Sequence, residues 1–198
     1  MLWSLLKGLR SRPAVAAPDG PRRLHIGGQV RKAGWEVLDA LPGPAVDHLG
    51  NARDLGRFAD GSFVELYASH CLEHLDFRSE VAPALREWHR VLAPGGRLYV
   101  SVPDLAALAQ LILNPALTVG DRRTVVKMLF GAHRDAYDYH QAGFDFALLR
   151  DDLEAAGFVA IRRVETFGLF DDYSALVSGG IPISLNVIAE RPAAAGAA

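Results

Sequence analysis

The chain alternates short apolar runs with segments whose apolar residues recur at helical spacing, from Pro21 to about residue 191. A clear helical segment is VAPALREWHRVLAPGG, and the runs of the other kind include RRLHIGG, WEVLDA, AVDHLGN, FVELYAS and RLYVSVPD. Such a chain buries its apolar surface as a sheet covered by helices on both faces. We therefore predict an α/β fold with a doubly wound, seven-stranded and mostly parallel sheet.

The C-terminal part of the chain departs from this alternation. FALLRDDLEAAG has the pattern of a helix closed by Gly157, and the strands FVAIRRVETF and PISLNVIAER follow with no helix between them. Because parallel neighbours need a long crossover, this order predicts one antiparallel strand, which we expect at the edge of the sheet. Further helices are predicted from Cys71 onward, over residues 105–113 and over residues 121–130.

We expect three parts: an N-terminal helix and linker over residues 1–21, one domain over residues 22–191 and a disordered tail over residues 192–198. MLWSLLKGLR has one apolar face but is too short to cross a membrane. It also lacks the continuous apolar core of a signal peptide. Two interpretations stay open, a short helix docked on the domain or frayed, and weak membrane-surface contact through residues 1–12.

Composition narrows the class of protein. Half of the residues are hydrophobic and 22% are charged, as in a soluble globular protein. The formal net charge of -2 gives no basic surface, so we expect no nucleic-acid partner. Cys71 is the only cysteine, which excludes an internal disulfide and fits a cytoplasmic location. Nothing in the sequence predicts an oligomeric state.

Glycine and polar residues collect where the predicted strands end. In open sheets of this kind, ligands bind beyond the carboxyl ends of the strands. The residues at or just beyond those ends are Gly27, Asp39, Asn51, Ser69, His70 and Asp104. We therefore expect the binding site at this edge.

The segment SHCLEH contains the pattern H-x-x-E-H, which some zinc hydrolases use. On a helix, His70 and His74 would share one face. A zinc hydrolase also needs a third protein ligand and a long helix, whereas DFRSEVAP interrupts this one. We therefore predict no metal, with Glu73 anchoring the helix start or the neighbouring loop, and with Cys71 and His74 as packing residues. His70 stays open between a role near the ligands and a structural one.

Taken in order, six segments resemble the class I S-adenosylmethionine-dependent methyltransferases, particularly small bacterial members. The segments are LHIGG, GWEVLD, FADGSF, ASHCLEH, EWHRVLAPGGRLYVSVPDL and YDYHQAGFD with the later LEAAGF. The resemblance spans residues 24–189. It implies a Rossmann-like fold and S-adenosyl-L-methionine as the cofactor.

The resemblance also implies a role for each cofactor-site residue. Gly27 and Gly28 lie under the cofactor, where glycine lets the backbone approach closely. Asp39 accepts hydrogen bonds from the ribose hydroxyls, although an ordinary strand-end aspartate is the alternative. Asn51 and Ala52 meet the adenine ring. The segment that begins at Ser69 forms the floor of the cofactor site.

Two positions depart from the family pattern. Gln29 stands where many relatives have the last glycine of the turn, and Val64 replaces an aspartate. The first puts a side chain near the methionine part of the cofactor, and the second removes an acidic group. A catalytically silent binding or scaffold protein with the same fold is therefore the alternative function.

In this family the insertion after the fifth strand covers the methyl acceptor. Here it holds FGAHRDAYDYHQAGFD, and we select His140 as the general base because imidazole titrates near neutrality. A polar loop that only supports the fold is the alternative. His70 is the second catalytic candidate, and Tyr139 and Asp104 are candidates for substrate binding, with helix capping as the alternative for Asp104. We expect methyl transfer to an oxygen or nitrogen of a small molecule or saccharide.

Overall fold

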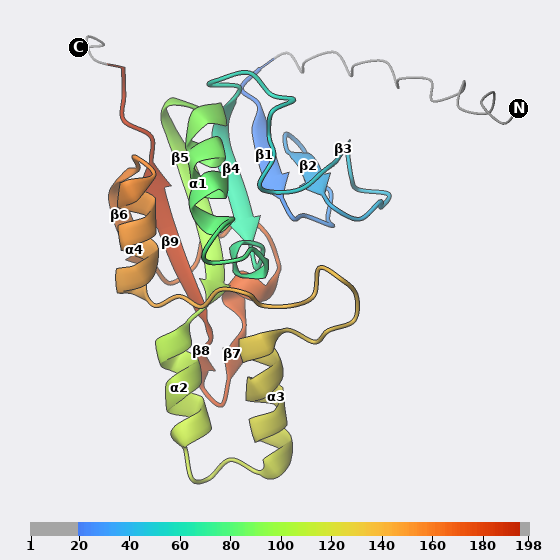
Figure 1. The fold of residues 1–198 in the computed structure, drawn as a ribbon, viewed down its shortest axis with the longest axis vertical. Helices are drawn as coiled ribbons and strands as arrows, with labels where there is room; N and C mark the ends of the chain where they lie inside the picture. Colours follow the sequence, from blue (N-terminus) through green and yellow to red (C-terminus); the bar gives the residue numbers. More distant parts are fainter. Residues whose placement is uncertain (1–19, 195–198) are drawn as a thin grey trace, which may run out of the picture.

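The computed structural model describes residues 20–194 (Figure 1). The expected N-terminal helix, with its membrane-surface contact through residues 1–12, lies outside these residues. So does the end of the expected tail, residues 195–198.

The strands form one seven-stranded sheet, which confirms the predicted α/β fold. Its order is β3-β2-β1-β4-β5-β9-β6, and all its strands except β9 run parallel. The strands are β1 (Arg23–Ile26), β2 (Glu36–Asp39), β3 (His48–Leu49), β4 (Phe63–Ser69), β5 (Leu92–Pro103), β6 (Val159–Val164) and β9 (Ser184–Glu190).

The antiparallel strand is not at the edge, and the sequence prediction was wrong on this point. β9 lies between β5 and β6, and β6 forms the edge. In this position β9 has hydrogen-bonded neighbours on both sides, and six of its seven residues are buried. A strand this apolar is more stable inside the sheet than at an edge with one row of unpaired backbone groups.

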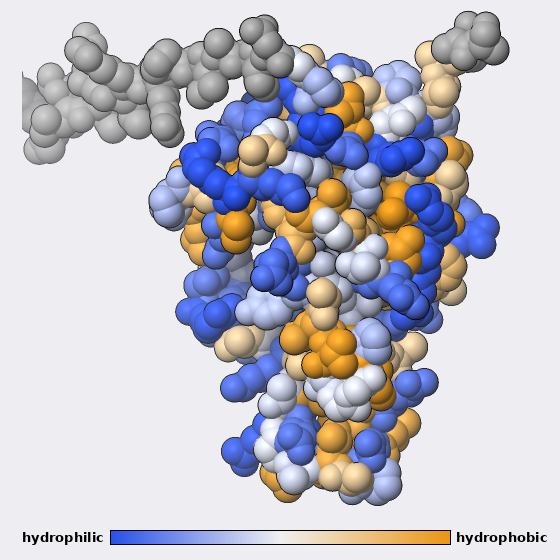
Figure 2. Space-filling view, turned by 180° about the vertical axis from the view of Figure 1, so that it is seen from behind, coloured by the Kyte–Doolittle hydropathy of each residue, from blue (hydrophilic) through white to orange (hydrophobic). Residues whose placement is uncertain are grey.

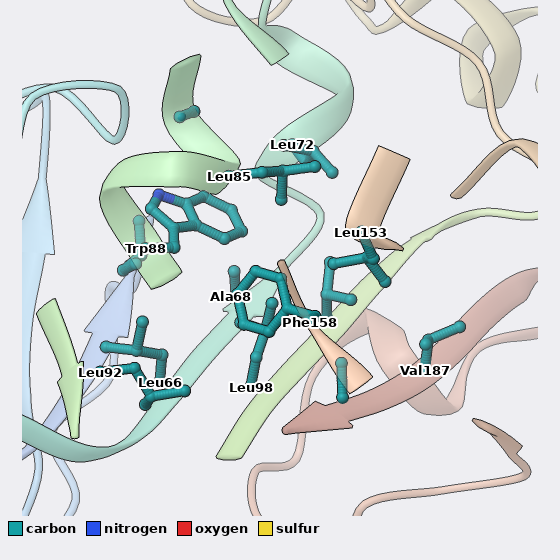
Figure 3. Close-up of a cluster of buried hydrophobic side chains, with 14 of the residues drawn as sticks. Leu66, Ala68, Leu72, Leu85, Trp88, Leu92, Leu98, Leu153, Phe158 and Val187 are labelled. Carbon is teal, nitrogen blue, oxygen red and sulfur yellow. The ribbon is translucent and has the colours of Figure 1, made fainter. Parts of the chain in front are cut away.

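The helices α1 (Val81–Val91) and α4 (Phe146–Ala155) cover one face of the sheet (Figure 1). Their apolar sides join the strands in the main core, where Trp88, Leu153 and Phe158 pack together with Leu66 and Leu98 (Figure 3). The Trp88 indole also donates to the carbonyl of Ala52 at 2.8 Å. That bond ties α1 to the loop after β3.

No helix covers the other face within residues 20–194, contrary to the sequence prediction. The connection between β1 and β2 runs only from residue 27 to residue 35, shorter than a helical crossover requires. Aromatic side chains from residues 165–170 cover Tyr67 and Tyr99 instead. Figure 2 shows this side of the molecule, where hydrophobic residues gather over the middle and lower part.

Two helices, α2 (Leu105–Leu113) and α3 (Val119–Phe130), form a hairpin that extends from the carboxyl end of the sheet (Figure 1). The short strands β7 (Val177–Ser178) and β8 (Ile181–Pro182) lie near it, and Ile183 packs against both helices. The prediction for α2 is confirmed. α3 starts at residue 119, because Thr118 and Asp121 form a capping box there.

The helix expected from Cys71 is wrong. Only one turn of 3-10 helix, η1 (Leu72–His74), follows β4, and α1 begins at Val81. A second turn of 3-10 helix, η2 (Tyr173–Ala175), lies after β6. None of the described helices is long and apolar enough to cross a membrane.

The buried His25 ring predicts that the free energy of unfolding decreases in acid. Its ring is 5% exposed and packs against Tyr67 and Phe170 on the helix-free face, and burial lowers its pKa to about 4. As pH falls below about 6.5, the unfolded chain gains a proton on His25 while the folded chain does not, so the free energy of unfolding falls until about pH 4. The loss is up to about 3 kcal/mol.

Urea unfolding of the wild type and of His25→Phe between pH 7.5 and pH 4.5 measures this loss. The variant keeps an aromatic ring without the titration, so its free energy of unfolding should fall less over this range. Equal falls for both proteins would contradict the assignment to His25.

Candidate functional site

Three loops meet at the carboxyl edge of the sheet. The Gly27 amide donates to the carbonyl of Leu38 at 2.8 Å, and the Gly50 amide donates to the carbonyl of Asp39 at 2.9 Å. The residues that follow β1, β2 and β3 are therefore hydrogen-bonded side by side. This brings together Gly27, Asp39 and the loop of Asn51, as the sequence predicts.

Both glycines of the first turn lack room for a side chain. Gly27 has a φ of 73°, and an added Cβ would lie 3.0 Å from Cβ and Sγ of Cys71. An added Cβ on Gly28 would lie 2.5 Å from the His25 ring. Gly27 is exposed, so its backbone is open to a ligand.

Asp39 presents a carboxylate at the end of β2. It is 8% exposed, and its Oδ1 accepts from the Leu41 amide at 2.7 Å. Burial raises its pKa, and the Asp135 carboxylate from the loop after α3 adds to the rise. A carboxylate with one oxygen held by the backbone has the other available to accept from ligand hydroxyls.

The Asn51 side chain turns toward its own loop. Its Oδ1 accepts from the Arg53 amide at 3.0 Å, as in an Asx turn. The carbonyl of Ala52 accepts from Trp88. The adenine contacts of both residues stay predictions, and a second lone pair on Asn51 Oδ1 leaves such a contact open.

The end of β4 carries Ser69 and His70. The Ser69 hydroxyl oxygen is buried without a hydrogen-bond partner among the described residues. His70 has a φ of 50°, and its Nε2 lies 2.9 Å from the Ser184 hydroxyl. Its Nδ1 lies 3.3 Å from Oε1 of Glu73, an ion-pair distance without hydrogen-bond geometry.

The segment of residues 131–145, which we call the acceptor loop, crosses the carboxyl edge of the sheet (Figure 1). The ring of Tyr139 stacks on His133 with centroids 3.9 Å apart. A cavity of about 480 Å³ opens here, lined by Phe130, His133, Ala136, Tyr139, His140 and Gln141. The structure thus places His140 and Tyr139 on one cavity.

Glu73 is a residue whose position the sequence analysis missed. Its carbonyl accepts from the amides of Gln141 and Ala142, at 2.7 and 3.1 Å, and its carboxylate is 1% exposed. Burial opposes ionisation, but the nearby histidines, His70 first, hold the pKa of Glu73 below its usual value. The H-x-x-E-H pattern was the available signal, and it could not reveal that a distant loop docks on this glutamate.

The Cys71 thiol and the Asp104 carboxylate are two further polar groups near this edge. Burial raises the pKa of the Cys71 thiol, and Glu73 and Asp39 raise it further, so the thiol is protonated and unreactive. Asp104 is 2% exposed, caps α2 by accepting from Ala106 at 3.0 Å, and pairs with Arg163 at 2.8 Å. Asp104 thus fills the capping role, and its contact with a substrate stays a prediction.

Residues 36–100 match a family model described as a methyltransferase domain. No curated protein matches the sequence. The match to the family model thus runs from β2 into β5.

Solved structures resemble the fold. A methyltransferase from Archaeoglobus fulgidus that depends on S-adenosylmethionine has a TM-score of 0.55 at 16% identity, over 87% of each chain. A Burkholderia thailandensis 1,6-didemethyltoxoflavin-N1-methyltransferase, solved with its substrate and S-adenosylhomocysteine, has a TM-score of 0.52 at 16% identity over 87% of this chain and 72% of that one.

A third similar structure is a possible exported protein from Bordetella parapertussis, with a TM-score of 0.54 at 17% identity. It matches 87% of this chain, which spans 63% of its length. At these identities the likeness shows a shared fold, in agreement with the sheet order found here.

We predict that a side chain at position 28 destabilises the fold, because its Cβ would overlap the His25 ring. Gly28→Ala should lower the free energy of unfolding by about 1 to 3 kcal/mol, because the His25 ring must move. Gly43→Ala is the matched control, since an added Cβ there meets Val46 at an ordinary 3.5 Å. Urea unfolding of both variants makes the measurement, and equal stability of the two would show that the turn has spare room.

Proposed function

We propose that this chain is a class I S-adenosylmethionine-dependent methyltransferase that transfers a methyl group from S-adenosyl-L-methionine to an oxygen or nitrogen of a small-molecule or saccharide acceptor, a proposal supported by the match to a methyltransferase domain and by the shared fold. The observation that carries the proposal is the side-by-side placement of Gly27 and Asp39 at the edge of the sheet that the acceptor loop, with the cavity of His140, also crosses (Figure 1). Cofactor groups and acceptor groups thus share one edge of the sheet.

On the cofactor side, Asp39 holds the ribose and the glycine turn lies under the methionine part. Gln29, which replaces a family glycine, is exposed. Its side chain therefore does not fill the buried turn around Gly28. Asn51, Ala52 and Ser69 complete the proposed cofactor site.

On the acceptor side, methyl transfer is a direct displacement at the sulfonium-bound carbon, so alignment supplies most of the rate. The carbon–sulfur bond breaks, the acceptor gains the methyl group, and an acceptor proton must leave. Burial lowers the pKa of His140, which keeps its imidazole neutral and able to accept that proton at pH 7. Tyr139 lines the same cavity. His70 does not line it, but lies 3.3 Å from Glu73, the residue on which the acceptor loop docks.

Calorimetric titration of the full chain with S-adenosyl-L-methionine tests the cofactor side. Asp39→Ala should weaken binding by about 1 to 3 kcal/mol, because charge-assisted bonds to the ribose are lost. Asp151→Ala, an exposed carboxylate on α4, is the control. An unchanged dissociation constant for Asp39→Ala would refute the ribose role, and no binding by the wild type would favour the scaffold.

The same titration tests Asn51. Asn51→Asp should bind the cofactor as well as or better than the wild type, because a carboxylate accepts from both the Arg53 amide and the adenine amino group. A large loss of affinity would place the adenine elsewhere.

A further inference from the structure

The Glu73 carboxylate is buried with neither oxygen hydrogen-bonded within residues 20–194. An ionised carboxylate taken out of water requires a cation or strong donors to be stable. A cation bound at Glu73 would supply the charge that its two oxygens, unpartnered among the described residues, require.

Two histidines face this carboxylate from different segments. Ligand atoms of Glu73, His74 and His140 all lie within 4.8 Å of one another. The His74 and His140 rings meet edge to face, with centroids 4.8 Å apart. One comes from the turn after β4 and the other from the acceptor loop, so the fold itself brings them together.

The backbone orients the His74 ring. Nδ1 of His74 lies 3.2 Å from the carbonyl of Tyr139. An imidazole whose N–H is held by a carbonyl keeps the lone pair of its other nitrogen for a ligand. Such outer contacts are usual behind metal-bound histidines.

We propose that Glu73, His74 and His140 bind a divalent transition metal ion, with Zn²⁺ the best match to two imidazoles and one carboxylate. Catalytic zinc sites commonly have three protein ligands and one open position. Because His140 lines the cavity of the acceptor loop, the open position faces the space proposed for the acceptor.

The geometry requires a small contraction. Bonds of about 2.0 to 2.1 Å in a tetrahedral site hold donors roughly 3.4 Å apart, so donor atoms that now lie within 4.8 Å of one another must close by up to about 1.4 Å. His74 ends the single turn η1 and His140 lies in the acceptor loop, and both are partly exposed, which allows their side chains to rotate. His70, at 3.3 Å from Oε1, positions the carboxylate from the other side.

The third proposed ligand, His140, could not be recognised from the H-x-x-E-H pattern. The spacing of SHCLEH suggests His70 and His74 on one face of an α-helix, but only the single 3-10 turn η1 forms there, and His70 precedes it. His140 supplies the missing ligand from far along the chain, brought in by the bonds of the next two amides to Glu73. The prediction of no metal rested on the absence of a third ligand and of a long helix, and the structure supplies a candidate for the first.

The role of the ion, unlike its binding, rests on the proposed function. A bound divalent ion lowers the pKa of a coordinated hydroxyl, so an alcohol acceptor loses its proton more readily. With such an ion bound, His140 would be a ligand and not the base, and the acidified acceptor hydroxyl would release its proton to solvent water.

Metal-stripped full-length protein is titrated with Zn²⁺ by calorimetry and with Co²⁺ by visible absorption, without S-adenosyl-L-methionine. We expect one ion per chain and the intense Co²⁺ bands of a low-coordinate nitrogen and oxygen site. Glu73→Gln, His74→Ala and His140→Ala should each weaken binding on the order of 100-fold or more. His133→Ala, which alters the same cavity at an exposed residue, should bind normally.

Circular dichroism reports whether each variant is folded, and His140→Ala, on the acceptor loop outside the core, decides the test if Glu73→Gln unfolds. No stoichiometric uptake by the wild type would overturn the proposal, as would unchanged uptake by His140→Ala. Since no cofactor is present, either result leaves the separate titration with S-adenosyl-L-methionine to judge methyl transfer.

Discussion

The carbonyl of Glu73 holds the functional edge of this protein together. It accepts two consecutive amides, Gln141 and Ala142, and so joins the turn after β4 to the acceptor loop. The Gln141 side chain adds a bond to the carbonyl of His74 at 2.9 Å. Without these contacts the cavity would lose its wall, and the His74 and His140 rings would have no fixed relation to each other.

The two faces of the sheet are packed differently. Helices α1 and α4 cover one face with an apolar core, and the hydrogen bond from Trp88 to the carbonyl of Ala52 fixes the loop of Asn51 to that core. The other face is covered by residues 165–170 and contains polar groups such as the Tyr67 hydroxyl, which donates to Asp172 at 2.7 Å. Rigidity for the site therefore comes mainly from the helical face.

Many of the strands and helices could be predicted from the sequence, because the spacing of apolar residues shows which side of each element is buried. The strands around Leu66 and Leu98 and the helix α2 appear where apolar spacing places them. The place of β9 depends on pairing between distant strands. The burial of Glu73 depends on a loop about seventy positions later, and single-sequence spacing reports neither.

The hairpin of α2 and α3 has its own small core, in which Leu108 and Leu111 meet Val125. The acceptor loop starts where α3 ends, at Phe130, and Phe130 lines the cavity. Phe130 thus belongs both to the hairpin and to the cavity wall. The packing of Leu108, Leu111 and Val125, which fixes where α3 ends, therefore also helps to set the shape of the cavity, although none of the three lines it.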